Sequence, residues 1–131
     1  ILQDKERFAG AQVFESSWGV GGKHMGWENK ETVWMWDTIY QAQQDFATIE
    51  NSTGTDFIEL AVKLARNELM LMESSDWFFM VTNNHTRDYA LKRFFDHYAR
   101  FARMVEMVKL NSIDEQSARW LDKIKHDDDI F

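Results

Sequence analysis

Glycine and proline are distributed very unevenly along this chain of 131 residues. The chain contains no proline, and of its six glycines only Gly54 lies beyond residue 26. Proline and glycine are the residues that most often interrupt regular structure, so a long stretch without them can stay helical. This distribution predicts an irregular, Gly- and Trp-rich segment over about residues 1–28 and a helical domain over residues 29–131.

Apolar residues recur at helical spacing in four stretches of the second part. They predict helices over about residues 30–49, 56–82, 86–108 and 112–124, with start signals at Asn29, Asp56 and Ser112. Short connections favour antiparallel neighbours, so we expect an all-α fold, a bundle of about four helices. The predicted faces are Val33, Trp36, Tyr40, Gln43, Ala47; Phe57, Leu60, Leu64, Leu71, Ser75, Phe78; Ala90, Phe94, His97, Phe101, Met104, Val108; and Ile113, Ser117, Trp120, Leu121, Ile124.

The charge balance and the missing residue types exclude several classes of partner. The formal net charge is −7, from 22 acidic and 15 basic residues, which disfavours nucleic acid and anionic membranes as partners. There is no cysteine, and none of the four histidines has a glutamate at the Glu-x-x-His spacing of helical metal sites. We therefore expect no metal and no cofactor, and a cytoplasmic location.

The chain carries more apolar surface than one small bundle needs. Trp34 and Trp36 lie about 200° apart on a helix, so they cannot both face one core. The apolar faces of the second predicted helix also point in several directions. Either this helix is central and its three partners surround it, or a further domain covers part of the surface. Because the chain starts at Ile1 without a methionine, we expect it to be a fragment of a longer protein.

Two tryptophans of the N-terminal segment, Trp18 and Trp27, are candidates for ligand contact. They lie among glycines, which allow a loop to be shaped tightly around a large ring. Each ring could plug the end of the bundle or form a platform for a ligand. A sugar suits such a platform, because an indole packs against the apolar face of a pyranose while nearby polar groups bind its hydroxyls.

Asp76 is the acidic residue with the most apolar sequence neighbourhood, and we expect it to be buried in the middle of the second helix. A buried carboxylate is costly unless it is paired, so Asp76 has either a structural or a functional role. In the structural role it pairs with Arg87 or Arg93. His97, on the inner face of the third helix, is expected to be a hydrogen-bonded core residue.

Taken together, these residues resemble the C-terminal α-helical domain of the 1,4-α-glucan branching enzymes of glycoside hydrolase family 57. The resemblance spans nearly the whole chain, with Asn83, Asn84 and His85 standing where a smaller, Gly-bearing turn is expected. The blocks that carry it are Ser16-Ser17-Trp18-Gly19 with Gly21-Gly22; Trp27, Trp34 and Trp36; Glu68-Leu69 before Ser74-Ser75-Asp76-Trp77; and Arg87-Asp88-Tyr89-Ala90 with Arg93, Phe94, His97 and Phe101.

The resemblance implies an accessory role within a larger enzyme. A catalytic β/α barrel earlier in the same protein would supply the Glu nucleophile and the Asp acid/base, cleave an α-1,4-glucan with retention and transfer it to a 6-hydroxyl. The helical domain would pack on that barrel, with Trp18 and Trp27 contacting the glucan and Asp76-Trp77 beside the active site. The chain alone would hold no catalytic residue and be inactive.

Two other classes of function remain open on the sequence. The first is a stand-alone helical module whose Trp-rich face binds a protein partner. The second is an independent glycosidase, which would need two neighbouring carboxyl groups, whereas Asp76 is a single candidate. The sequence does not distinguish branching from hydrolysis or disproportionation by the parent enzyme.

Overall fold

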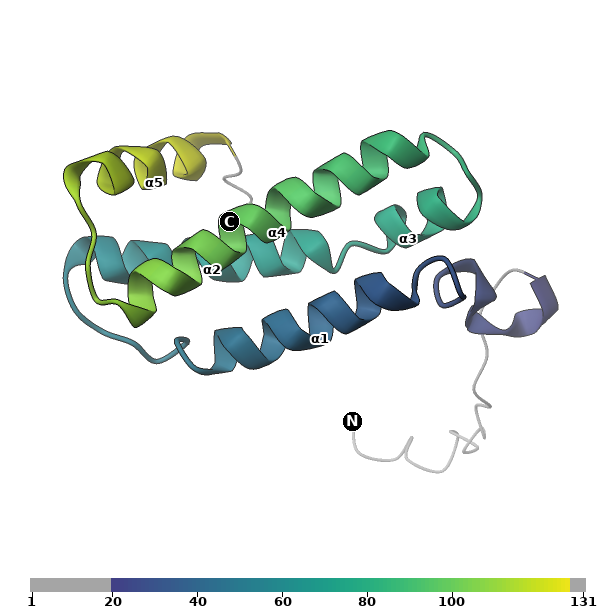
Figure 1. Ribbon diagram of the computed structural model, residues 1–131, viewed down its shortest axis with the longest axis horizontal. Coiled ribbons are helices and arrows are strands. Elements are labelled where there is room, and N and C mark those ends of the chain that lie inside the picture. Colours follow the sequence, from purple (N-terminus) through teal and green to yellow (C-terminus); the bar gives the residue numbers. More distant parts are fainter. Residues whose placement is uncertain (1–19, 128–131) are drawn as a thin grey trace, which may run out of the picture.

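The computed structural model describes residues 20–127, and this part of the chain is all-helical (Figure 1). The expected all-α fold is confirmed, and the described residues contain no strand. None of their helices is both long and apolar enough to cross a membrane. The elements are the 3₁₀ turns η1 (Val20–Gly22) and η2 (His24–Gly26), and the helices α1 (Val33–Ala47), α2 (Asp56–Met72), α3 (Ser75–Thr82), α4 (Arg87–Lys109) and α5 (Glu115–Asp127).

The second predicted helix is in fact two helices, α2 and α3, because the chain bends at Glu73 and Ser74. Ser74 has an extended ψ of 121°, which stops the helix. The carbonyl of Leu71 in the last turn of α2 accepts a hydrogen bond of 2.7 Å from the indole Nε1–H of Trp77. A helix end needs partners for its last carbonyls, so this side chain stabilises the break.

The centre of the bundle is α2, which packs against α1, α4 and α5 (Figure 1). The first alternative, a central helix surrounded by its partners, holds for residues 56–72, where Met70 stays 45% exposed. Nine of its residues are buried, on several sides: Ile58, Ala61, Val62, Leu64, Ala65, Asn67, Glu68, Leu69 and Met72.

The stripe that the sequence indicated for the first helix is not the side that packs in the core. The buried residues of α1 are Met35, Ile39, Ala42 and Phe46. The predicted stripe of Val33, Trp36, Tyr40, Gln43 and Ala47 points largely to solvent, and only Trp36 is half-buried. Both stripes have helical spacing, and the aromatic one is not the one that packs inside.

The predicted face of α4 is confirmed, since all six of its predicted inner residues are buried. They include His97, which is fully buried as expected of a core histidine. Its Nδ1 lies 2.6 Å from Oε2 of Glu68, and Glu68 is only 1% exposed. Oε1 of Glu68 lies 3.5 Å from the guanidinium of Arg100. A carboxylate is therefore buried in this core, on α2, with an imidazole and a guanidinium beside it.

The residues that cap the helices differ by a few positions from the expected ones. Thr32 rather than Asn29 precedes α1, and Thr55 caps α2 by accepting a 3.4 Å hydrogen bond from the backbone N–H of Ile58. Asp114 rather than Ser112 caps α5, accepting a 2.7 Å hydrogen bond from the backbone N–H of Ser117. Hydrogen bonds from the backbone and side chain of Ser117 lower the pKa of Asp114.

The turn between α3 and α4 holds two non-glycine residues with positive φ, Asn84 and Thr86, both at 50°. Asparagine tolerates this conformation, whereas a β-branched residue does so at a cost. The structure therefore places strain at the turn where the sequence departs from the expected Gly-bearing form.

Replacing Thr86 with glycine is expected to raise the free energy of unfolding by roughly 0.5–1 kcal/mol. The left-handed conformation costs an ordinary residue about 1–2 kcal/mol, and the greater freedom of glycine in the unfolded chain offsets part of the gain. Chemical denaturation measures the change. Thr86→Ala keeps a Cβ and should gain less, so a glycine variant less stable than the alanine variant would contradict the strain.

Candidate functional site

An open pocket of about 460 Å³ lies where the N-terminal turns meet α1 and the start of α3. Three rings and three polar residues line this pocket, which we call the aromatic pocket. The rings are those of Trp27, Trp36 and Tyr40, and the polar residues are His24, Glu28 and Ser75.

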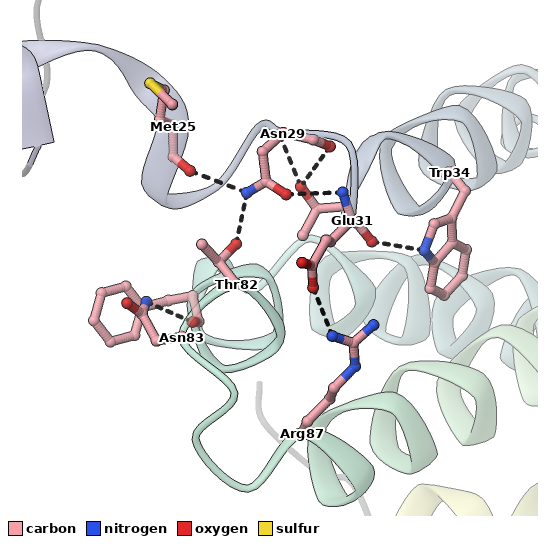
Figure 2. A network of polar contacts seen from close by, with 9 residues as sticks. Met25, Asn29, Glu31, Trp34, Thr82, Asn83 and Arg87 are labelled. Atoms are coloured by element: carbon pink, nitrogen blue, oxygen red, sulfur yellow. Dashed lines mark hydrogen bonds and ion pairs between the residues drawn. The ribbon is translucent and has the colours of Figure 1, made fainter.

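The side chain of Asn29 holds the N-terminal turns in place beside the bundle (Figure 2). Its amide nitrogen donates to the carbonyl of Met25 at 3.0 Å and to the hydroxyl of Thr82, at the end of α3, at 2.8 Å. Its amide oxygen accepts from the backbone N–H of Glu31 at 2.9 Å. The half-buried amide of Asn29 thus connects η2, the residues that precede α1 and the end of α3.

A second connection joins the same region to α4 (Figure 2). A carboxylate oxygen of Glu31 lies 2.6 Å from the guanidinium of Arg87, and both side chains are about two-fifths exposed, at 41% and 38%. An ion pair this exposed contributes little stability. Its geometric role is to bring the first turn of α4 against the residues that precede α1.

Aromatic side chains of α3 pack against the rings that line the pocket. The ring of Trp36 stacks on the buried ring of Phe78, with centroids 4.3 Å apart and planes inclined by 22°. The indole N–H of Trp36 donates to the backbone carbonyl of Trp27 at 3.1 Å. Tyr40 continues the wall one helical turn further, 6.2 Å from Trp36. The ring of Trp27 leans on Phe79 at 6.3 Å.

This combination suits a neutral, hydroxyl-rich ligand. Flat apolar rings offer contact area, and an imidazole, a carboxylate and a hydroxyl at the rim can donate and accept hydrogen bonds. No group of three or more His, Cys, Asp or Glu residues that could hold a metal ion occurs within residues 20–127. The pocket is therefore equipped for binding, and its residues include no pair of buried carboxyl groups for glycosidic cleavage.

The predicted site residues have different positions in the structure. Trp27 lines the aromatic pocket. Trp77 points the other way, toward α4, where its ring lies 6.3 Å from that of His97 and 6.4 Å from that of Tyr89. Trp18 lies outside the described residues.

The expectation that Asp76 is buried is wrong. The bend at Ser74 places Asp76 in the first turn of α3, where it is exposed. A carboxylate in the first turn interacts favourably with the helix dipole and needs no buried partner. Neither expected ion pair forms in residues 20–127: Arg87 pairs with Glu31, and no ion pair of the described part includes Asp76. Within residues 20–127, the buried carboxylate is that of Glu68 instead.

Sequence reasoning did not identify Trp36, Tyr40 or Ser75 as pocket residues. The signal for the first two was present, because they lie four residues apart on the stripe assigned to the core. For Ser75 no local signal exists, since it reaches the pocket only through the bend between α2 and α3.

Comparison with known proteins gives consistent matches. A family model described as "1,4-alpha-glucan branching enzyme, C-terminal" matches residues 38–131. The 1,4-alpha-glucan branching enzyme TK1436 of Thermococcus kodakarensis is 35% identical over 121 residues, which are 89% of this chain and 18% of that protein.

Two crystal structures resemble the fold. A GH57-type branching enzyme from Pyrococcus horikoshii superposes with a TM-score of 0.80 and 28% identity, over 92% of this chain and 23% of the other. TK1436 in complex with glucose and additives gives a TM-score of 0.76 and 28% identity, over 94% and 24%. The chain therefore spans less than a quarter of the length of these relatives.

Proposed function

Because this chain belongs to the family of C-terminal domains of 1,4-α-glucan branching enzymes, we propose that it forms one wall of the glucan cleft of such an enzyme. In this proposal a catalytic barrel of the same protein holds the reacting carboxyl groups. The helical domain packs on that barrel in the cytoplasm, and the segment 1–28 contributes to the cleft. Family membership does not favour the alternative of a stand-alone protein-interaction module.

The aromatic pocket is the observation that supports this role. Trp27, Trp36 and Tyr40 present ring surface beside the polar groups of Glu28 and His24. A pyranose has apolar C–H faces and a rim of hydroxyls, and it matches this pattern. A wall that binds the glucan and excludes water favours attack by a sugar hydroxyl on the glycosyl-enzyme.

The remaining candidate residues take separate roles in the proposal. Asp76 is exposed at the start of α3, next to the pocket residue Ser75, and there it accepts hydrogen bonds from sugar hydroxyls. Trp18 supplies a further ring to the glucan. Trp77 fixes α3 against α4 through its contact with His97, and so holds the neighbouring residues Ser75 and Asp76 in place for the substrate.

Replacing Trp27 with alanine in the full-length enzyme is expected to lower kcat/KM for branching of amylose about fivefold or more. The ring is lost from the pocket, and one stacking contact contributes on the order of 1 kcal/mol or more. The backbone carbonyl of residue 27 remains in the variant, so its hydrogen bonds with Thr32 and Trp36 are kept. The fall in iodine-stained amylose with time measures the rate.

Trp120 provides the matched control, since it lies on α5, at the other end of the bundle from η2 (Figure 1). Its ring is covered by the guanidinium of Arg103 at 4.1 Å. Trp120→Ala should reduce stability and leave branching unchanged below the unfolding temperature. Equal branching rates of the wild-type and Trp27→Ala enzymes would refute the proposed role of the pocket.

A further inference from the structure

The outward face of α1 continues beyond the aromatic pocket. Trp36, Tyr40 and Gln43 follow one another at four and three residues, so they lie in a row on one side of the helix. Tyr40 is 55% exposed, although its ring lies against that of Trp36. This row is the stripe whose helical spacing resembles that of a core face.

The far end of the row is polar and is fixed in position. The side-chain nitrogen of Gln43 donates to a carboxylate oxygen of Glu73 at 2.8 Å. Glu73 lies at the bend between α2 and α3, two residues before the pocket residue Ser75. The amide oxygen of Gln43 and the carboxylate of Glu73 have further lone pairs for hydrogen bonds from hydroxyl groups.

We propose that Gln43 and Glu73 extend the pocket rings of Trp36 and Tyr40 into a track, which binds an α-1,4-glucan chain beyond the sugar units held in the pocket. The inference rests on the proposed function and adds a specificity: the track discriminates long glucan chains from short ones. A short oligosaccharide fills only the pocket, whereas a longer chain also lies along α1.

The chemistry of the row favours a sugar chain over a protein partner. The centres of protein interfaces are depleted in charged groups, whereas here the rings are followed by an amide and a carboxylate, with the exposed Asp37 and Gln44 on the adjoining surface of α1. A glucan chain repeats an apolar face and a set of hydroxyls in every unit. It can place one unit on the ring of Tyr40 and the next against Gln43 and Glu73.

The test is Tyr40→Ala in the full-length enzyme, with branching rates measured on long amylose and on short maltooligosaccharide donors. We expect KM for amylose to rise about threefold to tenfold, the range that one ring contact accounts for. Because Tyr40 also lines the aromatic pocket, KM for short donors should rise as well, but clearly less than KM for amylose, and kcat should stay unchanged. Tyr89→Ala is the matched control, because Tyr89 is also 55% exposed and also lies beside one tryptophan, Trp77.

Each outcome has a definite meaning. An unchanged KM for amylose, or an equal rise for short and long donors, would overturn the track. A lowered unfolding temperature of Tyr40→Ala together with release of the helical domain from the barrel would show that Tyr40 is a domain contact, and would overturn it too. The Trp27→Ala enzyme distinguishes a failure of the track from a failure of the proposed function. If Trp27→Ala impairs branching and Tyr40→Ala does not alter the dependence on chain length, the track is refuted and the proposed function stands.

Discussion

Replacing Glu68 with alanine is expected to lower the free energy of unfolding by about 3–5 kcal/mol, because it removes one partner of the buried pair of Glu68 and His97. The Glu68 carboxylate is 1% exposed and the imidazole 0% exposed, and their atoms are 2.6 Å apart. Removal of the carboxylate leaves a buried ring N–H without its acceptor, which is far more costly than the loss of a surface contact. A domain of ordinary stability would lose a large part of its total free energy of unfolding.

Two variants of the same helix show whether the loss comes from the missing acceptor. Glu68→Gln keeps an oxygen that can accept from His97, and it should lose clearly less than the alanine variant, about 1–3 kcal/mol. Lys63→Ala removes an exposed charge from α2 and should change stability by no more than about 0.5 kcal/mol. Urea unfolding followed by circular dichroism gives all three values. A loss below about 1 kcal/mol for Glu68→Ala would contradict a stabilising pair.

Replacing Phe78 with alanine is the second change with a large expected effect, a loss of about 3–5 kcal/mol. Its ring is fully buried between those of Trp36 and Phe94, with ring centroids 4.3 Å and 6.5 Å away. The cavity would open directly under the wall of the aromatic pocket. We therefore expect both a less stable bundle and a changed near-ultraviolet circular dichroism signal of the tryptophans.

Phe57→Ala is the control for this prediction. Phe57 lies in the first turn of α2 and is 41% exposed, so its removal opens no internal cavity. Its loss should stay below about 1 kcal/mol. If both variants lost the same amount, the stability would not depend on the packing of Phe78 beneath Trp36.

The sequence predicted α4 best, because the residues of its predicted stripe are the ones that pack inside, while its further aromatic residues Tyr89, Phe95 and Tyr98 are exposed. All six predicted residues, from Ala90 to Val108, are buried. The face of α1 was predicted wrongly because two stripes of helical spacing compete there. Spacing alone cannot tell the packed residues Met35 and Ile39 from the row of the half-buried Trp36 and the exposed Tyr40, since an aromatic ring suits both a core and a binding surface.

The position of Asp76 could not be predicted, because it depends on contacts between distant elements. The helix ends at Met72, where the indole of Trp77 reaches back to the carbonyl of Leu71 and packs against His97 on α4. That bend moves Asp76 from a predicted core position to the exposed first turn of α3. For the same reason the sequence did not indicate that Glu68 is buried, because its partner, His97, follows 29 residues later.

The most direct test of the central claim, that the aromatic pocket binds the glucan, is a crystal structure of the full-length enzyme soaked with a maltooligosaccharide. The account predicts sugar density against the rings of Trp27 and Trp36, with hydroxyls within hydrogen-bond distance of Glu28 or Ser75. Rings covered by the catalytic barrel, or a glucan bound in the cleft with no contact to this pocket, would contradict it.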